Sequence, residues 1–276
     1  MIFVFKKWDE FCQKLCEKDI ISIPAVEVSS NTKGYLVLKH DVETDVPKAH
    51  ELAKIEQKYG HRGTYYVQAY LLDSVSNVEM LKDMQNMGHE ISYHYDVMDS
   101  CKGDIDKAIT EFDTNKNKFE GNGFVLKTLC QHGNPVVERV GYTSNRDFFR
   151  NDRVRATYPI LSDIMVNFKE MYKTEYVYFS DAGRKFKMIY DPLYNDVVNS
   201  DDKNIAYDNL DVVFNEIVKG GNFIISTHPH RWTSSATLYA IKTVIFKIVK
   251  SIAKLLIKIP LMKRFMSRFY YLAKKI

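Results

Sequence analysis

Short apolar segments alternate with stretches of helical pattern along the first 235 residues, and this alternation constrains the fold more than any other feature. Apolar, β-branched or aromatic runs predict strands at 35–38, 63–67, 89–93, 124–129, 177–179 and 222–226. Helical patterns with stop signals fall at 8–18, 47–59, 77–86, 104–119 and 210–219. Strands that alternate with helices predict βα units and a parallel sheet, so the expected fold class is α/β, and at this length the sheet could close into a barrel.

No repeat, low-complexity run or Pro/Gly-rich linker divides this part of the chain, so residues 1–235 are expected to form one domain. Of the 276 residues, 45% are apolar and 27% are charged, which argues against a disordered chain. The four cysteines form no C-x-x-C zinc pattern and need no disulfide framework. No secretory signal is recognisable after Met1, and we therefore expect a cytoplasmic protein.

Polar side chains gather where the predicted strands end. Asp41 and Glu43 follow the first strand, and His94 and Asp96 follow the third. Further polar residues follow the later strands, at 131–134, 180–181 and 227–230. Because sites in parallel α/β proteins lie at the carboxyl ends of the strands, these side chains are expected to share one face.

Carboxylate and imidazole groups without thiolates suit zinc or another divalent transition ion. Asp41 and Glu43 are two residues apart on an extended segment, so one could bind the metal while the other deprotonates a water molecule. His94 is the clearest histidine ligand, and His228 could protonate a leaving group. Four other histidines, namely His40, His50, His61 and His89, are expected to be structural.

Three segments resemble motifs of the polysaccharide deacetylase superfamily, also called the NodB homology or carbohydrate esterase 4 group. They read LKHDVE at 38–43, GHEISYH at 88–94 and ISTHP at 225–229. The resemblance implies a distorted (β/α)7 barrel that removes acetyl groups from glycans with Zn²⁺ or a related ion. It also implies that Asp41 is the catalytic base, Glu43 and His94 are metal ligands, and His228 is the catalytic acid.

Three further segments look like a divergent branch associated with O-antigen and capsule biosynthesis. They read CQHGNP at 130–135, YFSDAGR at 178–184 and THPHRW at 227–232. The residues in them expected to bind substrate are Asn134, Asp181, Arg184, His230 and Trp232. Asp181 and Arg184 could instead form a structural ion pair, and the 230–232 segment could anchor its loop.

The chain departs from the family pattern at Met98, which stands where a second metal histidine would fall. A thioether is a poor ligand for such an ion. His132 is the preferred substitute and Asp96 the second choice, although His132 could simply stabilise a turn. Glu43 is one methylene longer than the usual Asp, so the ligand and base roles of Asp41 and Glu43 stay interchangeable here.

The resulting expectation is a metal-dependent hydrolase that removes an acetyl or similar acyl group from a sugar, free or lipid-linked, in surface-polysaccharide biosynthesis. Two alternatives stay open: a catalytically silent glycan-binding protein of the same fold, which Met98 favours, and a metal-independent hydrolase of a small amide using Asp41 and His228.

Residues 236–276 carry ten Lys or Arg and no Asp or Glu. The remaining 29 basic residues face all 35 acidic ones, so residues 1–235 have a net charge of −6. From 238 to 259 apolar and basic residues alternate at helical spacing, and Pro260 should end or kink the helix before a second basic segment at 261–276. We expect this tail to bind an anionic membrane surface, peripherally at the inner face of the cell membrane, rather than nucleic acid. The alternative is an ordinary terminal helix packed on the domain.

Overall fold

The computed structural model describes residues 3–134, 137–181, 184–189, 206–207 and 209–256. The described strands are β1 (Leu36–Val42), β2 (Thr64–Val67), β3 (Glu90–Tyr95), β4 (Thr128–Gln131), β5 (Ser162–Asp163), β6 (Val177–Ser180), β7 (Phe186–Ile189), β8 (Ala206–Tyr207) and β9 (Phe223–Thr227). The described α-helices are α1 (Phe5–Cys16), α2 (Val46–Lys58), α3 (Val75–Asn86), α4 (Val97–Ser100), α5 (Ile105–Gly121), α6 (Asp147–Arg150), α7 (Asp152–Thr157), α8 (Phe168–Tyr172), α9 (Leu210–Val218) and α10 (Ala236–Leu256). Three short 3₁₀ helices are η1 (Ala25–Glu27), η2 (Ala69–Asp73) and η4 (Pro229–Arg231).

The described strands form one curled sheet in the order β5-β4-β3-β2-β1-β9-β6-β7-β8. All neighbours from β5 to β6 run parallel, whereas β7 and β8 are added antiparallel. The predicted α/β class and the parallel sheet are therefore confirmed. The sheet is barrel-like but open among the described strands, because β5 and β8 are its two edges.

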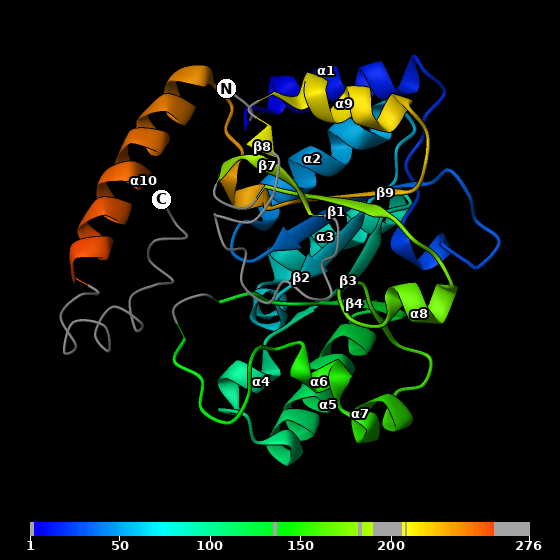
Figure 1. Ribbon diagram of the computed structural model, residues 1–276, viewed down its shortest axis with the longest axis vertical. Helices are drawn as coiled ribbons and strands as arrows, with labels where there is room; N and C mark the ends of the chain where they lie inside the picture. Colours follow the sequence, from blue (N-terminus) through cyan, green and yellow to red (C-terminus); the bar gives the residue numbers. More distant parts are fainter. Residues whose placement is uncertain (1–2, 135–136, 182–183, 190–205, 208, 257–276) are drawn as a thin grey trace.

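A layer of helices made of α1, α2, α3, α5 and α9 lies against one face of this sheet, which we call the outer face. α9 packs on α1, α1 on α2, and α2 on α3, while α5 packs on β3 (Figure 1). α1 shows why such a helix forms here, since its buried residues Trp8, Phe11, Cys12 and Leu15 recur every three or four positions. The Asp45 side chain caps α2 by accepting a bond from the backbone N–H of Lys48.

Side chains of the central strands alternate strictly between the two faces. In β1, Leu36 and Leu38 join the core beneath α1 on the outer face, whereas Val37 joins a second core with Tyr66 and Tyr178. We call the face of this second core the inner face. Lys39 and Asp41 continue the alternation of Val37 and therefore belong to the inner face.

Two predicted strands are displaced along the chain. β1 continues through the polar residues to Val42, because these residues pair with β2 and β9 on either side. β4 begins at Thr128, and the preceding Phe124 and Leu126 are instead buried in the core formed with α5. Asp41 is therefore held inside a paired strand rather than in a loop.

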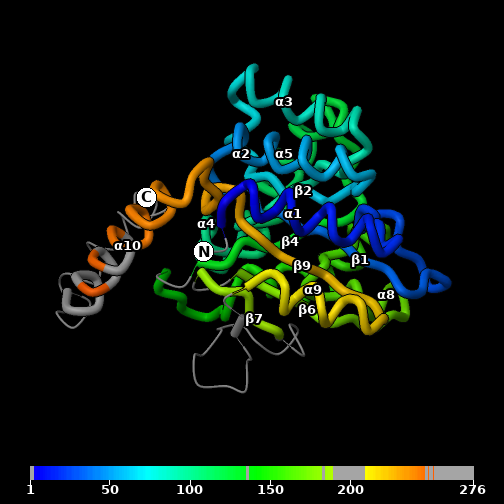
Figure 2. The backbone as a smooth tube through the Cα atoms, turned by 90° about the horizontal axis from the view of Figure 1, so that it is seen from above, coloured from blue at the N-terminus to red at the C-terminus, as the bar shows by residue number. Residues whose placement is uncertain are grey.

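α10 begins where the chain leaves the sheet, directly after a contact with the N-terminal segment. The backbone N–H of Thr233 donates to Phe3 at 3.1 Å, and the N–H of Phe5 donates to Thr233 at 3.0 Å. From this attachment α10 runs along the margin of the molecule, apart from the other helices (Figures 1 and 2). The second basic segment expected at 261–276 lies outside the described residues.

Candidate functional site

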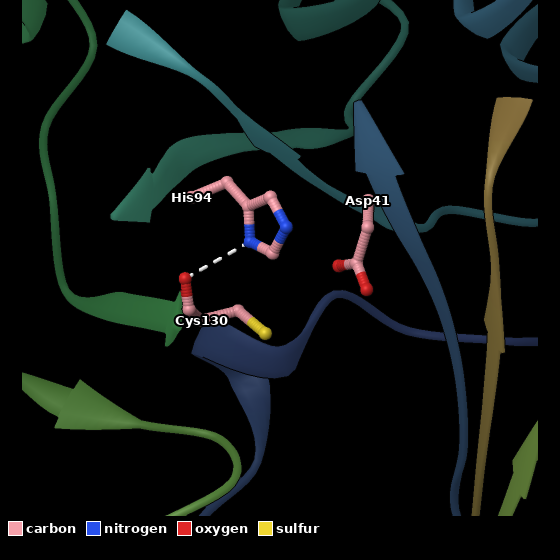
Figure 3. A group of neighbouring side chains, drawn as sticks. All are labelled: Asp41, His94 and Cys130. Atoms are coloured by element: carbon pink, nitrogen blue, oxygen red, sulfur yellow. Dashed lines mark hydrogen bonds between the residues drawn. The ribbon is translucent and has the colours of Figure 1, made fainter. Parts of the chain in front are cut away.

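The candidate site lies at the carboxyl ends of β1, β3, β4 and β9, as predicted. Asp41 is on β1, His94 on β3 and Cys130 on β4, and Figure 3 shows their side chains converging. These strands are parallel and belong to one run of the sheet, in which only β2 separates β1 from β3, so residues near their ends meet at one edge of the sheet. The predicted gathering of polar strand-end residues is therefore found for these strands.

Glu43, His94 and His132 offer ligand atoms that all lie within 4.8 Å of one another, and all three residues are buried. The Nε2 atom of His132 lies 3.0 Å from Oε1 of Glu43. The His94 and His132 rings are nearly perpendicular, with centroids 5.2 Å apart. These are the three residues predicted to hold the metal, and their placement is compatible with that role.

A hydrogen bond at Nδ1 orients the His94 ring. Nδ1 lies 3.0 Å from the carbonyl oxygen of Cys130 (Figure 3). A carbonyl only accepts, so Nδ1 carries the proton, and Nε2 presents a lone pair. Nε2 is buried and has no hydrogen-bond partner. Burial lowers the pKa of His94 to about 3, against the attraction of Asp41, so the ring is neutral. A buried, neutral and unpartnered nitrogen is what a metal ligand requires.

Met98 and His132 differ in their surroundings, and only His132 lies among the potential metal ligands. Met98 is buried in the core formed with α5, away from solvent, rather than among the polar groups. His132 arrives from the end of β4, where its backbone N–H donates to Tyr95 at 2.7 Å. Among the described residues, Asp96 belongs to neither of the two groups with metal-binding geometry.

A loop contact also fixes His132. Its carbonyl oxygen accepts a bond from Nδ2 of Asn145 at 2.8 Å, and the same nitrogen donates to Asp99. Asp99 in turn accepts two parallel bonds from Arg139, both at 2.8 Å. The loop after β4 is thus fastened to α4 through one carboxylate, and these contacts hold the backbone of His132 in place.

A second group of potential ligands consists of Asp41, His94 and Cys130. Lys39 donates to both carboxylate oxygens of Asp41 at 2.6 Å, and its side chain is only 1% exposed. Burial works against ionisation of Asp41, but the charge and hydrogen bond of Lys39, together with His94 and His228, lower the Asp41 pKa. Burial raises the pKa of the Cys130 thiol well above its usual value. A neutral thiol and a carboxylate already paired with an ammonium group make this second group the poorer metal site.

His228 follows β9 and is oriented by Asp181. Its Nδ1 lies 2.7 Å from Oδ1 of Asp181, and its backbone N–H donates to Oδ2 at 2.9 Å. Asp181 is fully buried, yet the charges of Arg231 and His228 hold its pKa below the usual range. Since an ionised carboxylate only accepts, Nδ1 of His228 carries a proton. Nε2 then faces the site, 3.9 Å from Asp41 and 3.8 Å from Glu43.

Asp181 and Trp232 do not have the positions expected of substrate-binding residues. Asp181 has no exposed surface, and its carboxylate accepts bonds from His228, Thr227 and Arg231. Trp232 is also fully buried, and its ring packs edge-on against Trp8. A ring enclosed by the core cannot stack on a sugar, so Trp232 anchors the loop, the alternative considered above.

The other predicted substrate-binding residues lie around the same region. Nδ1 of His230 is buried 4.0 Å from Oε2 of Glu43, and burial holds the His230 pKa well below its usual value. Asn134 is half-buried, and its carbonyl accepts a bond from Arg139. Arg184 is half-buried, with a left-handed backbone at φ 62°. Of the three, His230 is placed directly beside a predicted metal ligand.

The four histidines expected to be structural all have partners away from the site. His40 and His89 lie near the buried Glu56 on the outer face, His61 accepts the backbone N–H of Ser22, and His50 lies 2.6 Å from Asp83. Sequence reasoning missed Lys39, whose spacing of two from Asp41 on a strand would have placed both on one face.

Neither a family model, nor a curated protein, nor a solved structure matches this chain. What the site does is therefore inferred from its own geometry and chemistry.

Proposed function

We propose that the chain is a metal-dependent hydrolase that removes an acetyl or similar acyl group from a sugar during surface-polysaccharide biosynthesis. The observation that carries the proposal is the triad of Glu43, His94 and His132, set beside an ionised Asp41 and an oriented His228. The α/β sheet and the strand-end placement of these groups agree with a polysaccharide deacetylase type of barrel, and that fold type is part of the proposal.

Glu43, His94 and His132 would hold the metal, with zinc favoured by the mixture of imidazole and carboxylate donors. The bound ion would supply Lewis acidity toward the acyl carbonyl and toward water. His94 is suited to this role because its Nε2 is buried without a partner and its Nδ1 is tied to Cys130. The triad supports Glu43 rather than Asp41 as the ligand.

Asp41 would accept the proton of the attacking water at a carboxylate oxygen. Lys39 and Ser226 position Asp41, since Nζ of Lys39 contacts both residues and holds the carboxylate toward the inner face. His228 would deliver a proton from Nε2 to the departing amine or alkoxide. Asp181 stabilises the charged ring during this transfer, because its carboxylate accepts the proton-bearing Nδ1.

A catalytically silent glycan-binding protein is the second candidate, and the Lys39–Asp41 pair is the observation that favours it. A carboxylate whose two oxygens are both bonded to an ammonium group is a weaker base than a free one. The site would then be inactive because of Asp41 rather than because of Met98.

The main proposal also includes a reducing cytoplasmic location. The four described cysteines are all free, which supports this location.

Acetate release from N-acetylated and O-acetylated amino sugars, measured with the Zn²⁺-loaded full chain, tests the proposal. We expect turnover that His228→Gln lowers by about 10²- to 10⁴-fold, because the proton donor is lost. His50→Gln is the matched control, since His50 pairs with Asp83 outside the site. Binding of these sugars without any acetate release would favour the silent alternative, and turnover unaffected by His228→Gln would contradict the assigned roles.

A further inference from the structure

α10 exposes a row of large apolar side chains. Leu238, Ile241, Val244, Ile245 and Ile248 are each 40–56% exposed. Their spacing of three and four residues places them along one side of the helix. An uninterrupted apolar row of this kind is unusual on a soluble surface and indicates that something covers it.

The described contacts between α10 and the domain lie near the start of the helix, on the side opposite the row. Tyr239 packs against the core beneath α1, with its ring 6.3 Å from that of Phe3. Lys242 is half-buried, and its pKa is lowered by burial and by the nearby charges of Lys48 and Arg184. The helix is therefore anchored at its first turns, while the side chains of the row are exposed and the helix backbone lies at the margin of the molecule (Figure 1).

The charge of α10 indicates what kind of partner covers the apolar row. α10 carries four lysines and no acidic residue, and the remaining sequence to 276 adds six basic residues and no acidic one. No helix among the described residues is both long enough and apolar enough to cross a bilayer. An apolar row on a helix with only positive charges matches a bilayer interface, where apolar groups enter the acyl boundary and ammonium groups meet anionic headgroups.

We propose that α10 docks this protein onto membranes rich in anionic lipid, with the row from Leu238 to Ile248 inserted at the interface. α10 follows the loop bearing His228 and His230 with only the segment 232–235 between, so docking holds the candidate site close to the bilayer. The surface role depends on the exposed row and the charge, and it stands whether or not the hydrolase proposal is correct.

Co-sedimentation of the full chain with vesicles tests this proposal. We expect binding to vesicles of phosphatidylcholine with about one-third phosphatidylglycerol, and little binding to phosphatidylcholine alone. Ile241→Ser with Ile248→Ser should lower the partition coefficient at least about tenfold without changing the charge. Replacing Lys247 and Lys250 by Gln should lower it by about fivefold per lysine, and raised salt should weaken binding of the parent protein.

Val75→Ser with Val125→Ser is the matched control, since these two valines are 75% and 68% exposed on other elements. This pair of substitutions should leave vesicle binding unchanged. Equal partitioning of the parent and the Ile241/Ile248 variant would overturn the proposal. So would a concentration-dependent dimer that this variant abolishes in the absence of any vesicle binding, because the row would then be covered by a second copy of the chain.

Discussion

Nζ of Lys39 lies 2.6 Å from both carboxylate oxygens of Asp41, on a face of the sheet that is almost closed to solvent. The two residues are adjacent on the same side of β1, and Ser226 of β9 completes the contact at 3.2 Å from Nζ. This pair keeps Asp41 ionised next to the candidate metal ligands. Because both charges are buried, the same pair also contributes to the stability of the fold.

Loss of either partner should destabilise the protein, because the other charge would stay buried and unpaired. We expect Lys39→Met to lower the free energy of unfolding by about 3–5 kcal/mol, and Asp41→Leu to have a similar effect. The double variant should lose much less than the sum of the two. Urea denaturation of the four proteins measures this coupling, and additive losses would show that the pair contributes no stabilising interaction.

Asp181→Asn should impair the proton transfer assigned to His228. An amide can donate to Nδ1 and so stabilise the wrong tautomer, and we expect turnover to fall by about 10²- to 10⁴-fold. Metal content and KM should stay unchanged, which separates positioning from loss of the fold. Asp211→Asn, at an exposed pair with Lys14, serves as control. Full activity of Asp181→Asn would remove Asp181 from the mechanism.

Asn145→Ala should weaken metal binding without touching a ligand. Asn145 is fully buried and joins the His132 carbonyl to Asp99, so its loss frees the loop that carries His132. We expect the Kd for Zn²⁺, measured by competition with a chromophoric chelator, to rise about 10- to 100-fold. Asn151→Ala removes the cap of α7 and should cost stability but not metal affinity. Equal Kd values for the two variants would contradict the assigned role of Asn145.

Much of the fold follows from local pattern. The periodicity of Trp8, Phe11 and Leu15 predicts α1, and the alternation of helices and strands predicts the parallel sheet. The edge strands of the sheet cannot be predicted from local pattern, because β5 and β8 have two residues each and carry no periodicity. Their strand conformation depends on pairing with neighbours that are distant in the chain.

Some residues of the candidate site can likewise be predicted from local sequence, whereas others cannot. Asp41, Glu43, His94 and His228 stand in recognisable strand-end motifs, and His132 follows from the absence of a ligand at position 98. The choice between a substrate-binding and a structural role for Asp181 and Trp232 could not be made from sequence, because their burial depends on contacts with Arg231 and Trp8 made across the fold. Sequence position alone does not distinguish a residue that touches substrate from one that supports it.

Asp163 should make stability depend on pH. Burial raises its pKa to about 6, despite bonds from the Tyr95 hydroxyl and the Met165 backbone. The folded state therefore holds this proton more tightly than the unfolded chain, in which an Asp titrates near about 3.9. Its stabilising contribution is complete below about pH 4 and is lost as pH rises toward 6.

Asp163→Asn removes this titration, so the difference in unfolding free energy between the variant and the parent should grow in favour of the variant by about 2 kcal/mol from pH 4 to 7. Denaturation curves of both proteins at four or five pH values measure it. A constant difference over that range would mean that Asp163 is ionised in the folded protein throughout.

The metal content of the purified full chain is the most direct test of the proposed metal site of Glu43, His94 and His132. We predict about one equivalent of Zn²⁺ or a similar divalent ion per chain after preparation without chelator. His94→Ala should lose it, because His94 belongs to both candidate groups and its Nε2 is buried without a hydrogen-bond partner. His50→Ala should retain it. A parent protein that holds no metal and takes up none on titration would contradict the proposed metal site. So would a His94→Ala variant that binds the metal as tightly as the parent does.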